Sequence, residues 1–495
     1  MNNYSRPPTP TSPANGLRSL ICRPRRPMMN KFTLNLLPIV LLLTSVIAYA
    51  QSAASELGSL KSTAPLTSIP QLPIKSWHTP QGSQVLFVQN NHLPMFDLQV
   101  VFAAGSARDD GAAGLAQLTL GMLDEGAGQY DALQIAEGFD AVGAQFHKQA
   151  GRDSLAVTLR SLSSQEHSSK AVGLLTDVLG KPQLADDKLQ AIKDQLTSQL
   201  IQRQGVQTYR ATDLLYQHAY ANHPYATNSA GTRQTIESLT IADIRAFHQQ
   251  ALAAGNALIT LVGDLSLEQA QAIALQVSSA LPSGPALSPL PVPAAFEPEI
   301  YHLEHPGSQA LLLFAIPGIS VHHADAPALT LANLILGGPG ATSRLFDELR
   351  SQRGLTYGAR SKLIQHPASG LWTFTTEVEA RYRDASMALL EQLLADYAAQ
   401  GPTAQEVEDA KHKLRGSYLL GSVSNQQISD ILIHTGVNQL PLDSRQAFLD
   451  KVQALTLDQL KVALKKHLKL DKLVQISVGP TVEQDALPNI EPATG

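Results

Sequence analysis

Three short clusters of histidine and acidic residues have the composition of metal ligands. In His302–His305 (HLEH) the imidazoles are three residues apart, in a segment that favours a β-strand and is stopped by Pro306. Glu166–His167 lacks a histidine three residues before the glutamate, and the adjacent His322–His323 would point to opposite sides of an extended chain. We therefore interpret these clusters as exposed polar residues and not as metal sites.

Gly337–Gly340 (GGPG) has the glycine content of a phosphate-binding loop but lacks the residues that bind phosphate. Such a loop needs Lys followed by Ser or Thr after its last glycine, and here the chain continues as 341–344 (ATSR). We interpret this segment as the end of a helix and a turn. The sequence also has no G-x-S-x-G motif and only one cysteine, Cys22, so a hydrolase with a nucleophilic side chain has little support.

Arg350 and Tyr357 are seven residues apart in 343–357 (SRLFDELRSQRGLTY), which has the pattern of a helix followed by a strand. A guanidinium donates to peptide carbonyls without losing its charge, and a phenol donates one more hydrogen bond where an oxyanion develops. The alternative is structural: Arg350 would cap a helix C-terminus and Tyr357 would pack in a strand. The spacing alone favours this structural alternative.

Composition and charge limit the class of partner. The chain has 495 residues, 44% of them apolar, which is enough for large cores in roughly two to four folding units. Its 37 Lys and Arg face 42 Asp and Glu, but the first 50 residues contain six basic side chains and no acidic one. Residues 51–495 therefore carry 31 basic and 42 acidic groups, a net charge of −11. Such a body repels polyanions, so we expect no nucleic-acid partner.

Residues 1–50 have the pattern of an upstream extension followed by a signal peptide. A basic step at Lys31 precedes an apolar run over 34–47 and the small-x-small sequence 48–50 (AYA). The run is shorter than the about 20 residues that span a bilayer and contains Pro38, so a retained anchor is the less favoured alternative. We expect an exported protein, periplasmic in a Gram-negative bacterium, with no membrane anchor after cleavage and no cysteine in the mature chain.

Two halves with the same order of expected elements flank a proline-rich segment. Residues 281–298 (LPSGPALSPLPVPAAFEP) contain six prolines and no helical periodicity, which is typical of a linker. On each side we expect strands, a helix, a hairpin, two further helices and a closing strand. Three residue pairs match at offsets of 212, 219 and 220 residues, namely Phe102 with Phe314, Gly151 with Gly370, and Pro182 with Pro402. This period indicates a duplicated unit.

We therefore predict an N-terminal half over 51–280, a linker over 281–298 and a C-terminal half over 299–495. Hairpins followed by runs of helices favour an antiparallel sheet with helices packed on one face over a doubly wound parallel sheet. The predicted fold class is α+β, with two duplicated halves that enclose a cavity.

The duplicated layout and several specific sequences resemble the pitrilysin/insulinase family of zinc peptidases, the inverzincins, over nearly all of residues 70–480. Members of this family carry H-x-x-E-H after the sequence Gly-Leu-Ala, with two zinc-binding histidines and a glutamate general base. Here Gly114–Ala116 keeps the frame, but Gln117 and Gly121 stand at the histidine positions and Leu120 at the glutamate position. The window expected to supply the third ligand, 191–205, contains no glutamate.

These replacements leave no intact catalytic residue and no metal ligand. An amide, a missing side chain and a leucine cannot replace two imidazoles and a base. Gln117, Gly121, Asp124 and Glu125 share one helical face by spacing, so a weak contact to a hard cation stays an alternative, although acids at a helix end are usually solvated. We expect no cofactor in this chain.

The resemblance implies that Arg350 and Tyr357 reach across the cavity to a bound peptide and to its polarised carbonyl. It also implies a non-catalytic subunit of a two-chain peptidase, whose partner contributes H-x-x-E-H and the zinc while this chain helps to position the peptide. The alternatives are a scaffold or assembly protein of the same fold, and an autonomous hydrolase with an unrecognised site.

Overall fold

The computed structural model describes residues 71–294, 297–367 and 369–488. The predicted signal peptide and upstream extension lie outside these residues. In the part of the chain that is described, no helix combines the length and the apolar character needed to cross a bilayer.

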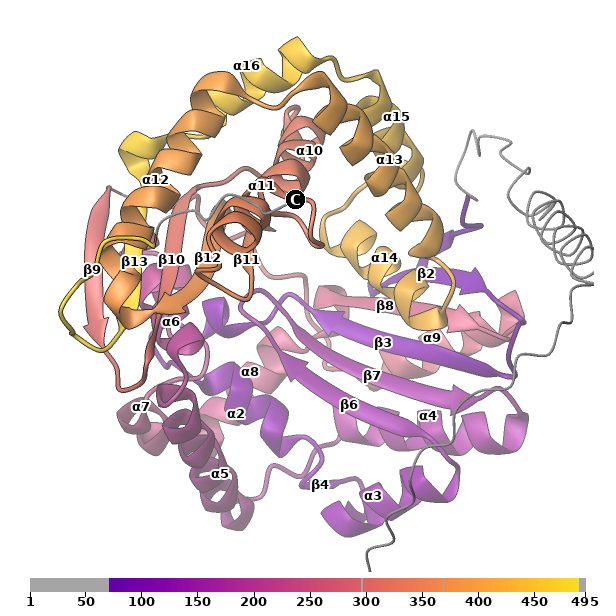
Figure 1. The fold of residues 1–495 in the computed structure, drawn as a ribbon. Helices are drawn as coiled ribbons and strands as arrows, with labels where there is room; N and C mark the ends of the chain where they lie inside the picture. Colours follow the sequence, from indigo (N-terminus) through magenta and orange to yellow (C-terminus); the bar gives the residue numbers. More distant parts are fainter. Residues whose placement is uncertain (1–70, 295–296, 368, 489–495) are drawn as a thin grey trace, which may run out of the picture. The chain divides into compact units, whose positions relative to one another are not determined.

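The first half is built on a six-stranded sheet in the order β1-β2-β8-β3-β7-β6 (Figure 1). Its strands form where the sequence is continuously or alternately apolar, because such segments bury one or both faces of a sheet. The bounds are β1 Lys75–His78, β2 Gln84–Gln89, β3 Met95–Phe102, β6 Gln145–Ala150, β7 Leu155–Leu162 and β8 Ala257–Gly263.

The second half repeats this arrangement with five strands in the order β9-β13-β10-β12-β11. The bounds are β9 Glu299–Glu304, β10 Gln309–Pro317, β11 Ala359–Gln365, β12 Gly370–Glu379 and β13 Val474–Gly479. In both halves the closing strand inserts between two strands that are consecutive in the chain, β8 between β2 and β3 and β13 between β9 and β10. The shared order identifies the two halves as copies of one topology.

Each sheet is antiparallel except for one pair. The closing strand runs parallel to the earlier of its two neighbours, β8 to β2 and β13 to β9, and antiparallel to the later one, β3 or β10. A parallel pair requires a long crossover, which the helices between these strands provide. The predicted α+β class with mainly antiparallel sheets is confirmed.

One face of each sheet carries the helices of its own half. In the first half these include α2 Leu115–Met122, α3 Ala132–Ala141, α4 Gln165–Gly180, α5 Asp186–Gln204, α7 Arg233–Ser238, α8 Ile241–Ala251 and α9 Leu267–Ala280. In the second half they include α10 Ala326–Gly337, α11 Arg344–Phe346, α12 Arg383–Gln400, α13 Ala404–Leu420, α15 Ser444–Ala454 and α16 Leu457–His467. The two main cores lie beneath these layers.

The opposite face of each sheet is covered in part by a helix from the other half (Figure 1). Helix α14, Asn425–Val437, packs Ile428 and Leu432 against first-sheet residues that include Leu258. Helix α6, Gln207–Ala219, packs on β10 and β13 of the second sheet. The predicted one-sided helix layer therefore describes each half's own helices, while the exchanged helices add cover to the second face.

The proline-rich segment runs along the first half and is held there by hydrogen bonds. The backbone N–H of Ala254 donates to the Pro282 carbonyl, and that of Gly255 donates to the Gly284 carbonyl. Further along, Arg108 Nη2 donates to the Ser288 carbonyl at 2.6 Å. Its described residues form neither helix nor strand before β9. The segment is therefore an anchored connection.

Candidate functional site

Helix α2 holds the positions of the degenerate zinc motif, and a buried aspartate fixes its N-terminus. Asp109 accepts hydrogen bonds from the backbone N–H groups of Gly114 at 2.7 Å and Ala116 at 2.9 Å. Gly114 has a φ of 98°, which only glycine adopts readily. Burial raises the pKa of Asp109 to about 7, although the backbone hydrogen bonds favour its ionised form. The frame of the motif therefore has a structural role at the start of the helix.

Two of the three positions that carry histidine and glutamate in zinc peptidases lie against apolar side chains. Leu120 is buried in the first core, and Gln117 is half-buried. A Cβ on Gly121 would lie 2.8 Å from Ile192 Cγ2, so the missing side chain leaves no open space. Ile192 comes from α5, within the 191–205 window that lacks a glutamate. The residues present therefore do not fit a zinc ion.

A lysine from β6 lies at the end of this helix. Lys148 Nζ donates to the Gly121 carbonyl at 3.2 Å and forms an ion pair with Asp124. The ammonium group neutralises the carboxylate on which the hard-cation alternative depends. Among the described residues, no α2 residue belongs to a group of three or more His, Cys, Asp or Glu with metal-ligand spacing.

The structure brings Arg350 and Tyr357 together through the backbone. Arg350 lies in a turn of π-helix over Asp347–Gln352, and its Nη1 donates to the Tyr357 carbonyl at 2.7 Å. Its guanidinium also lies over the Phe346 ring, 4.9 Å from the centroid. The Tyr357 side chain is 86% exposed. Both side chains are therefore accessible to a ligand, and the phenol is not packed in a strand.

The neighbouring arginines make structural contacts. Arg344 forms two hydrogen bonds of 2.7 Å with the Glu406 carboxylate, and its guanidinium lies 5.0 Å from the Tyr397 ring centroid. These bonds hold the pKa of Glu406 at about 2. Arg353 pairs with Glu348 at 2.9 Å.

A buried polar network joins the two halves, and the sequence analysis missed it. Asp153 of the first half accepts from the Tyr225 hydroxyl at 2.6 Å and contacts His366 Nδ1 of the second half at 2.6 Å. His366 Nε2 lies 2.8 Å from the Tyr216 hydroxyl. Burial raises the pKa of Tyr216 to about 12, so the hydroxyl stays protonated. A pocket of about 360 Å³, lined by both halves and the linker, includes Asp153 and Arg108.

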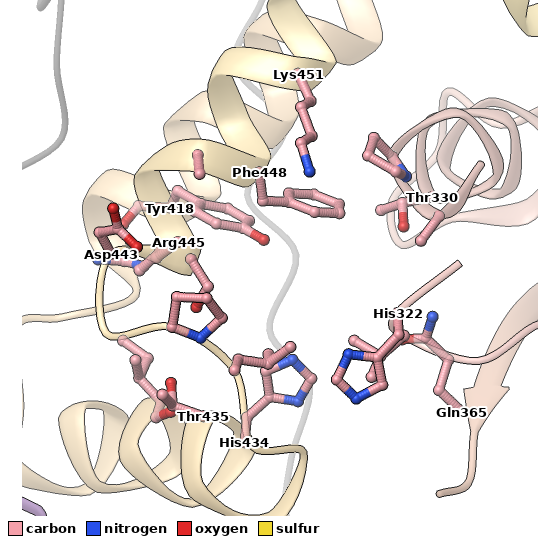
Figure 2. Close-up of a pocket in the computed structure, with 18 of the residues that line it drawn as sticks. His322, Thr330, Gln365, Tyr418, His434, Thr435, Asp443, Arg445, Phe448 and Lys451 are labelled. Carbon is pink, nitrogen blue, oxygen red and sulfur yellow. Dashed lines mark hydrogen bonds between the residues drawn. The ribbon is translucent and has the colours of Figure 1, made fainter. Parts of the chain in front are cut away.

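A larger pocket of about 760 Å³ lies within the second half and was not predicted. Figure 2 shows His322 on one side and His434 on another, with Tyr418 and Phe448 forming an aromatic wall. Burial lowers the pKa of His434, so its imidazole is neutral near neutral pH. The lining residues come from α10, α13, α14, α15, the end of β11 and the loops beside the helices, so spacing within one segment could not reveal the pocket.

Two of the histidine clusters make the surface contacts expected of polar residues. His302 contacts Ser477 at 2.9 Å and lies near Arg383 at the end of β9, and His167 contacts Ser164 at 2.7 Å on an exposed turn. The third prediction needs correction. His322 is exposed at the pocket, but His323 is only partly exposed and packs beside Asp325 and His467, because the turn before α10 folds it back onto α16.

Comparisons with known proteins agree with this architecture. Residues 84–233 match "Insulinase (Peptidase family M16)" and residues 238–414 match "Peptidase M16 inactive domain". A solved peptidase M16 inactive domain from Pseudomonas fluorescens is 41% identical with a TM-score of 0.81, over 84% of this chain and 100% of that one.

Curated relatives cover most of the chain at lower identity. The Helicobacter pylori protein named "Non-peptidase homolog YmxG" is 27% identical over 399 residues, 79% of this chain and 90% of that protein. An "Uncharacterized zinc protease" of Mycobacterium leprae is 25% identical over 417 residues, 81% of this chain and 92% of that protein.

A repeated α+β unit with a glycine-framed helix at the zinc-motif position defines a two-lobed peptidase-like protein. The chain belongs to peptidase family M16, the insulinase family, as the sequence resemblance predicted. It is a member in which Gln117, Leu120 and Gly121 replace the residues of H-x-x-E-H.

Proposed function

We propose that this protein is the exported, non-catalytic and substrate-positioning subunit of a heteromeric zinc metallopeptidase that cleaves peptides. The observation that carries the proposal is the closed packing at α2. Leu120 is buried and Ile192 occupies the space beside Gly121, so the helix offers neither zinc ligands nor a general base.

Zinc and the base would come from a partner chain of the same family with an intact H-x-x-E-H motif. The partner's zinc would activate a water molecule and polarise the scissile carbonyl. In this chain, Arg350 and Tyr357 would contribute hydrogen-bond donors to the peptide from an exposed position beside the π-helical turn. A donor that meets a developing oxyanion contributes roughly 10²–10³ in rate.

Export is supported by the basic step, the apolar run and the small-x-small sequence within residues 31–50. The protein would be periplasmic in a Gram-negative bacterium and would have no membrane anchor after cleavage.

The test compares peptidase activity of the mature chain, the H-x-x-E-H-bearing relative and their mixture, each with and without a chelator. We expect the isolated chain to be inactive and the mixture to exceed the relative alone. Chelator-sensitive cleavage by the isolated chain would contradict the proposal. Stable association without any change in the relative's activity would favour a scaffold protein instead.

A further inference from the structure

Three side chains from two distant segments meet beside the larger pocket. His323 and Asp325 precede and begin α10, and His467 ends α16. One ring nitrogen of each histidine and one carboxylate oxygen of Asp325 lie within 4.8 Å of one another. His467 Nε2 is 2.8 Å from Asp325 Oδ2, and the two imidazole centroids are 5.0 Å apart with rings at 88°.

Two imidazoles and one carboxylate form a ligand set that suits zinc and related transition metals. Ligands about 2.0–2.1 Å from a tetrahedral zinc lie about 3.3 Å from one another, so small side-chain rotations bring the three groups into range. The backbone N–H of Asp325 donates to His323 Nδ1 at 3.0 Å, so this nitrogen binds a metal only after that hydrogen bond opens. His323 also lines the 760 Å³ pocket, which gives an ion and a water ligand access.

We propose that His323, Asp325 and His467 bind one divalent transition-metal ion, with zinc as the best match. The site lies in the second half and uses no residue of α2, so it is independent of the function proposed above. Its role is to tie the turn before α10 to the end of α16 at the edge of the pocket.

The competing explanation is an ion-pair cluster without a metal. Lys466 Nζ is 2.8 Å from Asp325 Oδ2, and together with His467 it keeps the pKa of Asp325 below its ordinary value. The Lys466 side chain is 58% exposed and can turn into solvent when a metal takes its place. If the cluster binds a metal, removing Lys466 should tighten zinc binding. If it is only an ion-pair cluster, no zinc should bind with or without Lys466.

The test uses the mature chain, stripped of metal, and zinc alone in equilibrium dialysis. We expect the wild type to bind one zinc per chain. His467→Ala and His323→Ala should each weaken zinc binding by at least about 10–100-fold, which is the loss seen when only a partner of a metal ligand is removed. His322→Ala is the matched control, because it removes the adjacent imidazole outside the cluster, and it should bind like the wild type. Lys466→Met should tighten binding, since the competing ammonium is gone.

Thermal unfolding of each metal-free variant checks that the fold is kept, and cobalt substitution should give tetrahedral d–d absorption that His467→Ala abolishes. Should the wild type bind no zinc, or should the double variant of His323 and His467 retain it, the assignment is wrong.

Discussion

At the residue scale, Gly121 and Ile192 explain why this helix cannot be converted into a zinc site by changing the motif alone. The Ile192 Cγ2 methyl lies only 2.8 Å from the place where a Cβ at position 121 would be. Loss of the ligands and filling of their space are therefore coupled, and any side chain at Gly121 requires Ile192 to move.

Gly121→Ala tests this coupling. Alanine in a helix interior gains about 1 kcal/mol over glycine, but overpacking against Ile192 costs about 1–3 kcal/mol. We expect Gly121→Ala to stabilise the Ile192→Ala background and to be neutral or destabilising in the wild type. Urea unfolding of the four proteins gives the coupling energy. Equal effects in both backgrounds would contradict the contact.

Arg350 and Tyr357 lead to a second prediction at this scale. Tyr357→Phe removes only an exposed hydroxyl, so stability should change by less than about 0.5 kcal/mol. Turnover by the assembled complex should fall roughly 10²–10³-fold if the phenol meets the oxyanion. Arg350→Ala should also reduce turnover, and Arg353→Ala is the matched control. Steady-state kinetics measures the effect, after a check that each variant still binds the partner subunit. Unaltered turnover would assign Arg350 and Tyr357 a structural role.

At the scale of elements, local sequence patterns predict the strands and helices well. The apolar run 84–89 forms β2, and the Ala- and Leu-rich run 385–400 forms most of α12, because periodicity indicates which face of an element is buried. The same patterns do not indicate which other element packs against that face. The cover that α6 and α14 provide, and the meeting of His323 with His467, depend on contacts far apart in sequence.

The Arg344–Glu406 pair joins α11 to the start of α13 and gives a pH prediction. The folded pKa of Glu406 is about 2, below its ordinary value of 4.5, so the pair's contribution is present above about pH 4.5 and is lost as the pH falls toward 2. Allowing for partial exposure, we expect roughly 1–2 kcal/mol at neutral pH. Glu406→Gln should lose this stability and flatten the acid limb of the unfolding curve.

The exposed Glu166 serves as the control for this prediction. Its carboxylate is 3.9 Å from Lys170 on an exposed helix face, so Glu166→Gln should keep the wild-type pH dependence. An identical acid limb for Glu406→Gln and the wild type would show that the bidentate pair does not contribute.

At the scale of the whole molecule, the exchange of helices packs each half against the sheet of the other. Helix α14 covers one face of the first sheet, and helix α6 covers one face of the second. The Asp153–His366 contact also joins the two halves. Sequence repeats predicted two similar halves but gave no sign of this exchange, since a repeat describes each copy separately.

Cutting the linker tests this interdependence. A protease site inserted near the exposed Val292 should yield two fragments that remain associated after cleavage. Each fragment alone lacks the helix that covers one face of its sheet, because that helix belongs to the other fragment. Size-exclusion chromatography after cleavage makes the comparison, with the intact chain as reference. Two fragments that elute as separate folded monomers would show that the exchanged helices contribute little.

The exchange also affects how the chain matures during biosynthesis. Leu432 of α14 packs against Leu258 of the first sheet but follows it in the chain by 174 residues. At a synthesis rate of about 5–20 residues per second, the ribosome makes Leu432 on the order of ten seconds or more after Leu258. Throughout that interval the nascent first half presents an uncovered apolar surface. A chaperone therefore has time to bind this surface before α14 covers it.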